Sequence, residues 1–146
     1  MIVILDNLRS ALNVGSILRT CDALGITEVY LCGITPSITD NKVLKTSLGA
    51  EGNIKITETP DTFDTVRSIK GNGYQIIGLE LTKDSVDIRK VKADHKSALI
   101  VGNEVGGLNE EILSLCDVVT EIPMSGIKES LNVAVAFGIA AYEMTK

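Results

Sequence analysis

The sequence predicts an α/β fold in which a mostly parallel sheet carries helices on both faces. Three observations point to this class. Short runs of β-branched and other apolar residues alternate along the 146-residue chain with stretches of helical periodicity. Hydrophobic residues make up 45% and charged residues 23% of the chain, values typical of a globular domain. No linker, repeat or low-complexity segment interrupts the pattern, so we expect residues 1–146 to form a single domain.

The expected strands are short apolar runs bounded by turn-forming residues. The turn Asn72-Gly73 precedes one run, and Pro123 ends another. Several runs are apolar at nearly every position, which favours strands covered on both faces, as in parallel sheets. In chain order, the expected strands are residues 2–5, 28–32, 54–57, 74–79, 97–101 and 118–122.

The segments between these runs favour helices. Gly25 follows the first helical pattern as a stop signal, and Asp61 is a suitable N-cap. Ser130 is the N-cap candidate for the last helix, which would place Asn132 in the first helical turn. Small and apolar residues fill that helix and indicate close packing against another element. The expected helices are residues 12–24, 43–48, 61–69 with the cap included, 108–115 and 131–144.

Charge and aromatic content exclude several classes of protein. The chain has 14 Lys plus Arg and 19 Asp plus Glu, a net charge of −5. This excludes a basic protein that coats nucleic acid, but it is compatible with an enzyme that binds RNA through a local patch. Aromatic residues are only 3% of the chain and Trp is absent, which disfavours a base-stacking RNA-binding module.

Cysteine and histidine are too few and too scattered for a metal site. Cys21, Cys32 and Cys116 form no CxxC pair and His95 is the only histidine, so we expect no metal and no disulfide framework. Unpaired cysteines are typical of a reducing cytoplasm. The amino terminus lacks the basic flank of a signal peptide, and no apolar run reaches membrane-spanning length. We therefore expect a cytoplasmic protein.

The loop after the run 97–101 has an unusual composition. Ligands of open parallel sheets bind beyond the carboxyl ends of the strands, where this loop, Gly-Asn-Glu-Val-Gly-Gly-Leu at residues 102–108, is expected. Its glycines allow sharp bends and close approach to a ligand, and Glu104 adds a carboxylate. The spacing matches neither a phosphate loop nor a dinucleotide fingerprint. The alternative is a plain turn with a solvated Glu104.

Two further segments place polar side chains at helix starts. Ser130 and Asn132 precede the last helix, where most such residues serve only as caps. Asn13 or Ser10 begins the first helix, and Arg19 follows Asn13 by about one and a half turns. Arg19 either covers the rim of the core with its aliphatic stem or aims a guanidinium at a phosphate or a developing oxyanion.

The densest basic stretch, residues 89–96, contains His95. It is either a solvated face or a modest candidate for RNA contact. No GxSxG elbow is present in the chain, which disfavours a Ser-His-Asp hydrolase.

Taken together and in order, these segments resemble the SpoU (TrmH-like) family of the SPOUT class of RNA 2′-O-ribose methyltransferases. The resemblance covers nearly the whole chain, and its specificity comes from the order of segments that are individually weak signals. A fourth segment, Lys-Thr-Ser-Leu-Gly-Ala-Glu at residues 45–51, is similar to a further family signature. The three main segments are residues 13–25, 100–108 and 122–136.

The resemblance implies an α/β domain whose carboxyl-terminal segment forms a deep trefoil knot, a topology that residue patterns do not predict. It implies S-adenosylmethionine as cofactor and transfer of its methyl group to a ribose 2′-hydroxyl of tRNA or rRNA. The match begins at the first strand, so a bare catalytic domain without an added RNA-binding domain is expected. The implied cofactor-binding residues are Gly102, Ile122 and Leu131, with Leu79 and Met124 nearby.

The same match implies catalytic roles for Asn13, Arg19, Glu104, Ser130 and Asn132. Arginine is effectively always protonated, so we expect Arg19 to stabilise the developing oxyanion and anchor a phosphate rather than act as a base. Asn13 and Asn132 would orient the ribose or Arg19, and Ser130 would form a hydrogen bond within the site. Glu104 would position Arg19 or an RNA group, or relay the proton.

A homodimer is also expected. The resembled family works as dimers with its last helix near the interface, and the last helix here is apolar almost all round. Two other functions remain open. One is another nucleotide-binding α/β enzyme such as a dehydrogenase, which the missing phosphate fingerprint disfavours. The other is a non-catalytic RNA-binding protein on the same fold, which the acidic net charge mildly disfavours.

Overall fold

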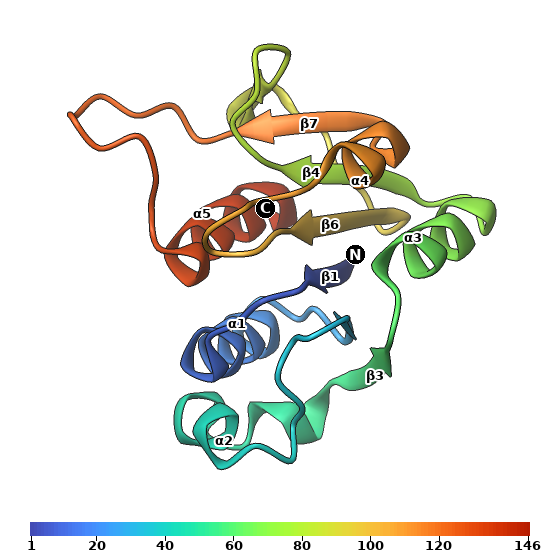
Figure 1. Ribbon diagram of the computed structural model, residues 1–146, viewed down its shortest axis with the longest axis vertical. Coiled ribbons are helices and arrows are strands. Elements are labelled where there is room, and N and C mark those ends of the chain that lie inside the picture. The colour runs from blue at the N-terminus through green and yellow to red at the C-terminus, as the bar shows by residue number, and fades with distance from the viewer.

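One seven-stranded sheet forms the centre of the protein in the computed structural model, which describes all 146 residues (Figure 1). Every neighbouring pair of strands is parallel, which confirms the expected sheet type. The strand order is β3-β2-β1-β6-β4-β7-β5. The strands are β1 (Ile2–Asp6), β2 (Glu28–Cys32), β3 (Lys55–Thr59), β4 (Gln75–Leu79), β5 (Val86–Asp87), β6 (Ser97–Val101) and β7 (Val118–Glu121).

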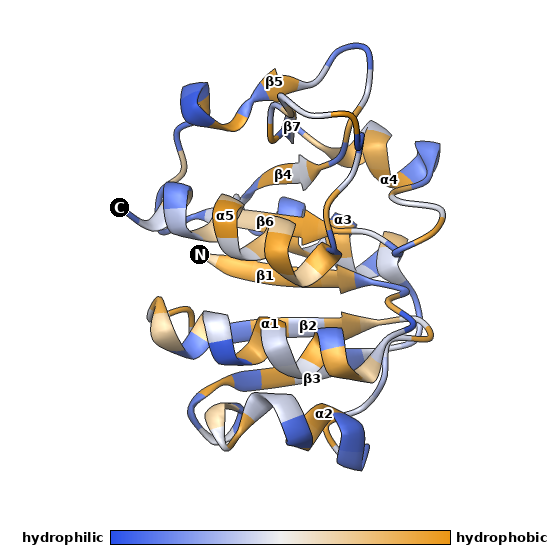
Figure 2. Ribbon diagram, turned by 90° about the vertical axis from the view of Figure 1, so that its left-hand side faces the viewer, coloured by the Kyte–Doolittle hydropathy of each residue, from blue (hydrophilic) through white to orange (hydrophobic).

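Helices cover both faces of this sheet, as the sequence predicts. The first, second and last helices pack on one face, and the third and fourth pack on the other (Figures 1 and 2). Two short 3-10 turns, Ala50–Asn53 and Ile88–Lys90, complete the elements. The helices are α1 (Ala11–Ala23), α2 (Asn41–Ser47), α3 (Thr62–Gly71), α4 (Glu110–Leu115) and α5 (Val133–Thr145).

The two faces of the sheet bury two separate cores because side chains alternate along each strand. In β1, Val3 and Leu5 pack into the core beneath α1 and α5, whereas Ile2 and Ile4 pack into the core beneath α3 and α4. Phe137 of α5 is fully buried in the first core. The continuous apolar runs in the sequence therefore reflect strands that are covered on both sides.

Local sequence determines where α1 begins and ends. Ser10 is the N-cap, and its side chain accepts a hydrogen bond from the backbone N–H of Asn13. At the other end Gly25 adopts a φ of +70°, and the N–H groups of Gly25 and Ile26 donate to the carbonyls of Asp22 and Cys21. This pairing is a Schellman motif, for which glycine is the least strained residue.

Three local expectations need correction. Asn132, not Ser130, is the N-cap of α5, because its side chain accepts hydrogen bonds from the N–H groups of Ala134 and Val135. Helix α4 begins at Glu110 rather than Leu108, since Asn109 caps it. Strand β5 was not predicted, because two residues at the sheet edge carry no periodic signal.

None of the helices has both the length and the apolar character needed to cross a membrane. The trefoil knot stays a prediction from the resemblance.

Candidate active site

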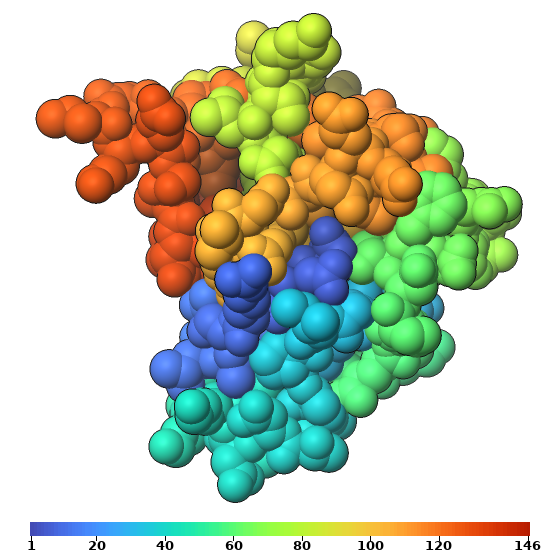
Figure 3. Space-filling model, in the orientation of Figure 1, coloured from blue at the N-terminus to red at the C-terminus, as the bar shows by residue number.

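A cavity of about 740 Å³ lies at the carboxyl edge of the sheet, where the loops after β4, β6 and β7 meet the starts of α1 and α5. In Figure 3 the segment before α5 stands away from the body and leaves a recess beside the loop that follows β4. The structure brings together nine of the ten residues predicted for the site, and only Arg19 is absent from the lining. The nine are Asn13, Leu79, Gly102, Glu104, Ile122, Met124, Ser130, Leu131 and Asn132.

The glycine loop, residues 102–108, is folded by its own hydrogen bonds. The side chain Oδ1 of Asn103 accepts from the N–H groups of Val105 and Gly106 at 2.8 and 3.1 Å. Its Nδ2 donates to the carbonyl of Asn7 at 2.6 Å, which ties this loop to the loop after β1. Gly107 donates back to the carbonyl of Asn103 and has a φ of +63°. The loop is therefore a compact turn anchored to a neighbour.

The fold of its own loop already requires a glycine at position 102. A Cβ atom built on Gly102 would lie 2.5 Å from the carbonyl carbon of Gly107 and 2.6 Å from the nitrogen of Leu108. These distances are far below van der Waals contact. Its own loop therefore excludes a side chain at Gly102, which also lines the cavity, and its close approach to a cofactor stays a prediction.

Glu104 connects the glycine loop to the start of α1. Its carboxylate accepts hydrogen bonds from the backbone N–H groups of Arg9 and Ser10 at 2.8 and 3.0 Å, and from Nδ2 of Asn13 at 3.3 Å. Partial burial acts to raise the pKa of Glu104, but these N–H donors outweigh it, so the pKa lies below its ordinary value. A carboxylate already held by three donors is a poor proton acceptor, so the geometry favours a positioning role.

A chain of side-chain hydrogen bonds continues from Glu104 to the last helix. Asn13 receives a hydrogen bond from Nδ2 of Asn132 at 3.2 Å, while Oδ1 of Asn132 caps α5. Three segments that are far apart in the sequence are thus joined at the cavity through Glu104, Asn13 and Asn132. The structure confirms that these residues lie together, and their catalytic roles remain predictions.

Sequence reasoning missed two cavity carboxylates, Glu80 and Glu121. Glu80 directly follows β4, and its carboxylate accepts the N–H groups of Leu81 at 3.0 Å and Leu108 at 2.9 Å. Glu121 ends β7, and its carboxylate accepts the hydroxyl of Ser85. Both lie at the carboxyl ends of strands, where ligand contacts are expected, and that position was the available signal.

The outer wall of the cavity is an extended segment, residues 123–131. No hydrogen bond joins it to the rest of the chain, and every residue in it is exposed. Ile127 is 99% exposed, the largest exposed fraction among the large hydrophobic residues. Ser130 lies here with no hydrogen-bond partner, and Met124 and Leu131 turn only part of their surface to solvent. The cavity therefore has two different walls. Hydrogen bonds to neighbouring elements hold the glycine loop, residues 102–108, firmly, whereas the segment 123–131 has none and is loosely held.

Arg19 lies outside the cavity of its own chain. It is exposed on α1, and its side chain forms neither a hydrogen bond nor an ion pair. Six residues separate it from Asn13, a rotation of about 240° around the helix, so the two side chains leave α1 in different directions. Within one chain Glu104 therefore holds Asn13 and the start of α1 and does not contact Arg19. Its predicted roles toward Arg19, an RNA group or the proton stay predictions.

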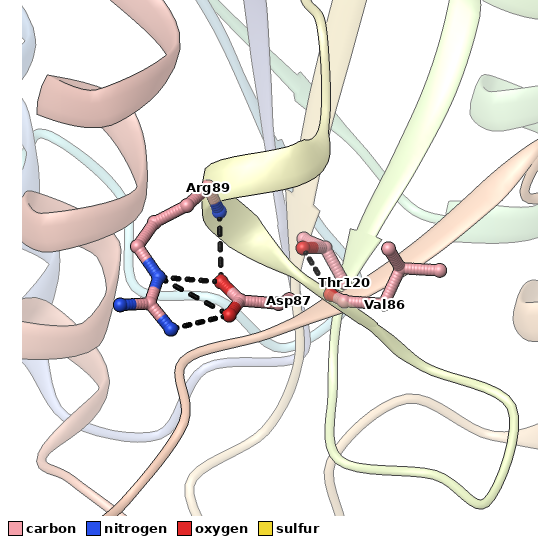
Figure 4. A network of polar contacts seen from close by, with 4 residues as sticks. All are labelled: Val86, Asp87, Arg89 and Thr120. Carbon is pink, nitrogen blue, oxygen red and sulfur yellow. Dashed lines mark hydrogen bonds and ion pairs between the residues drawn. The ribbon is translucent and has the colours of Figure 1, made fainter.

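The basic stretch 89–96 does not add positive charge to the cavity. Arg89 is paired with Asp87, with Nε 2.9 Å from Oδ1, and this pairing lowers the pKa of Asp87 to about 2 (Figure 4). Lys96 directly precedes β6, and its Nζ donates to the carbonyl of Asn72, just before β4. The end of the stretch therefore lies at the amino edge of the sheet, opposite the cavity.

The chain matches the model of the SpoU rRNA Methylase family over residues 1–142. It is 35% identical over 147 residues to the tRNA (guanosine(18)-2′-O)-methyltransferase of Aquifex aeolicus, an alignment that covers 98% of this chain and 67% of that enzyme.

Solved structures of similar proteins share the fold. The SpoU methyltransferase AviRb from Streptomyces viridochromogenes, in complex with AdoMet, gives a TM-score of 0.91 at 27% identity and covers 99% of this chain and 59% of that chain. The AdoMet-bound rRNA methyltransferase from Sinorhizobium meliloti gives 0.91 at 33% identity, with coverage of 97% and 54%. This chain thus spans little more than half the length of those two proteins.

Fold and site together define the class of protein. A parallel α/β domain whose cavity gathers Glu104, Asn13 and Asn132 at the carboxyl edge of the sheet has the architecture of a ligand-binding α/β domain. The match over nearly the whole chain then identifies the family: this chain belongs to the SpoU family of RNA methylases, which confirms the resemblance seen in its motifs.

Proposed function

We propose that this protein is an S-adenosylmethionine-dependent RNA methyltransferase that methylates a ribose 2′-hydroxyl of tRNA or rRNA. The observation that carries the proposal is the cavity, which gathers the three motif segments of the family at one edge of the sheet. The names of the Aquifex and Sinorhizobium relatives support the same class of reaction. A dehydrogenase is disfavoured by the family match.

The residues present fit S-adenosylmethionine. The cavity volume lies within the usual range of about 300–1,000 Å³ for small-molecule sites. Leu79, Ile122, Met124 and Leu131 offer apolar surface, and Gly102 brings backbone groups to the wall. Carboxylates in the lining suit a ligand that carries a sulfonium and an ammonium group. When bound, the cofactor supplies a methyl group on a sulfonium, from which a neutral thioether leaves.

The chain's own residues then have to align the hydroxyl and stabilise the charge that develops on its oxygen. Asn13 and Asn132 hold each other at the cavity wall and can orient a ribose there. Glu104 fixes the start of α1 and so holds Asn13 in place. Arg19 is the proposed electrostatic stabiliser, because a guanidinium keeps its proton.

The position of Arg19 supports an active homodimer. Leu12 and Arg19 are seven residues apart on α1, nearly two full turns, so they share one face of the helix. On the neighbouring α5, Val135, Ile139 and Tyr142 are 51%, 43% and 65% exposed, and Leu12 is 47% exposed. A second copy covering this apolar surface would bury it, and Arg19 of one copy would face the other copy.

Two variants test whether the site is shared between copies. Arg19→Ala and Asn132→Ala should each abolish methyl transfer alone. If Arg19 of one copy serves Asn132 of the other, co-expressed variants form mixed dimers with one intact site, and activity returns to about a quarter of wild type. No recovery in mixed dimers would place both residues in a site made by one chain. A monomer that methylates RNA, seen by sedimentation equilibrium, would contradict the dimer.

The reaction itself is tested with cofactor labelled in its methyl group and unmodified tRNA and rRNA transcripts. A 2′-O-methyl group blocks alkaline hydrolysis at that position, so the label should appear in alkali-resistant dinucleotides. Label in mononucleotides would indicate base methylation instead. RNA binding without any label would favour the non-catalytic alternative.

We further propose that residues 1–146 act as the catalytic unit and that the protein works in the cytoplasm. The family match from the first strand to α5 supports the first statement. Three free cysteines, two of them buried, support the second, because such cysteines persist in a reducing compartment.

A further inference from the structure

Four glutamates line the cavity: Glu129 on the segment 123–131, and three others at the sheet edge and in the glycine loop. Glu80, Glu104 and Glu121 belong to its walls, and none of them takes part in an ion pair. The charged groups that do pair elsewhere, such as Arg89 with Asp87, lie outside the cavity lining. The fold has therefore gathered more negative than positive charge around a concave site.

The donors that hold these carboxylates are neutral. Backbone N–H groups of Leu81 and Leu108 hold Glu80, and the hydroxyl of Ser85 holds Glu121. Neutral donors fix the direction of a carboxylate, but they carry no net positive charge that would cancel its negative charge. Both side chains are half-buried, so solvent screens them less than it screens surface carboxylates.

The lining contains a single cationic side chain, Lys128, on the loosely held segment 123–131, and that segment also carries Glu129. The balance in the cavity therefore stays negative. The negative charge of the lining therefore favours a positively charged ligand. The proposed reaction exchanges charge at this point, because the cofactor enters as a sulfonium cation and the product is a neutral thioether.

We propose that Glu80 and Glu121 make the cavity selective for the cationic cofactor over its neutral demethylated product, so that product inhibition is weak. This inference rests on the proposed function. Glu104 is not part of the proposal, because its carboxylate already accepts three hydrogen bonds, from the N–H groups of Arg9 and Ser10 and from Nδ2 of Asn13. The Debye length at physiological salt is about 8 Å, so charges on the cavity lining act on a ligand that lies against them.

The experiment measures affinities by isothermal titration for three probes: S-adenosylmethionine, S-adenosylhomocysteine, and sinefungin, in which a protonated amine replaces the methylsulfonium. Glu80→Gln and Glu121→Gln should each weaken binding of the two cationic probes by about three- to tenfold and leave S-adenosylhomocysteine within about twofold. S-adenosylmethionine and sinefungin are both cationic, but the charge lies on sulfur in the first and on nitrogen in the second. An equal loss of affinity for both would therefore report on charge rather than on contact with the methyl group.

Loss of local structure would weaken all three probes together, so the ratio of affinities distinguishes selectivity from misfolding. Glu111→Gln is the matched control, because Glu111 lies exposed on α4 outside the cavity lining. An unchanged ratio in both variants would overturn this inference while leaving the function intact. Failure of the wild-type protein to bind S-adenosylmethionine would instead overturn the proposed function.

Discussion

The two walls of the cavity are built in opposite ways. The glycine loop, residues 102–108, is held from both sides, with Glu104 bound to the start of α1 and Leu108 bound to Glu80. The segment 123–131 is longer, lines the same cavity, and has no hydrogen bond to the rest of the chain. A substitution should therefore be costly in the first wall and cheap in the second, although both walls face the same ligand.

The largest expected effect is that of Gly102→Val. Its side chain would collide with the backbone of Gly107 and Leu108, so we expect a loss of roughly 2–4 kcal/mol in the free energy of unfolding, together with loss of cofactor binding. Gly126→Val is the matched control, because nothing lies within 4 Å of a Cβ built there and its φ is not positive. Urea unfolding measures both, and equal destabilisation would contradict the comparison.

Glu104→Gln should cost about 1–2 kcal/mol, because a neutral amide cannot accept from both N–H groups of the α1 start. The pKa of Glu104 is lowered in the folded protein, so its contribution is present above the unfolded value of about 4.3 and is lost as pH falls through the folded value. The stability difference between wild type and variant should therefore shrink below that pH. Glu129→Gln, on the loosely held wall, should show no such difference at any pH.

Asn132→Ala should lower the free energy of unfolding by about 1 kcal/mol through loss of the α5 cap. Ser130→Ala is the control for the same region, since Ser130 has no hydrogen-bond partner, and its stability should equal that of wild type. If Ser130→Ala proved the more damaging change, the cap assignment would be wrong.

The smallest effect is expected for Ile127→Ser. A side chain that is 99% exposed buries no apolar surface, so the change in the free energy of unfolding should stay within about 0.5 kcal/mol. A destabilisation well above this value in thermal or urea unfolding would show that the segment 123–131 packs against the body in solution.

Much of the fold could be predicted, because strand burial and helix ends depend on residues that lie close together in the sequence. Continuous apolar runs indicate strands that are covered on both faces. The structure confirms all six predicted strands at or near their predicted bounds. Gly25 ends α1 and Asp61 caps α3 as expected, since each acts within a few residues of itself. Nine of the ten site residues predicted from the motif segments also lie in the cavity lining, because strand ends of a parallel sheet meet at one edge.

The tertiary structure decided what depends on distant partners. Whether Ser130 or Asn132 caps α5 depends on where the helix begins after the segment 123–131, which has no hydrogen bonds to guide it. The hydrogen bond from Asn132 to Asn13 joins residues far apart in the sequence, so it exists only in the folded chain. Gly102 is needed because of its own loop, which no spacing rule shows.

Residue patterns alone were enough to assign the class of the protein, an acidic, aromatic-poor α/β chain whose ordered motifs place it in a methyltransferase family. Only the tertiary structure placed Glu80 and Glu121 in the cavity and Arg19 outside it. The physical reason is that electrostatic environment and side-chain direction arise from elements brought together in space, whereas periodicity and capping act between residues near one another in the chain.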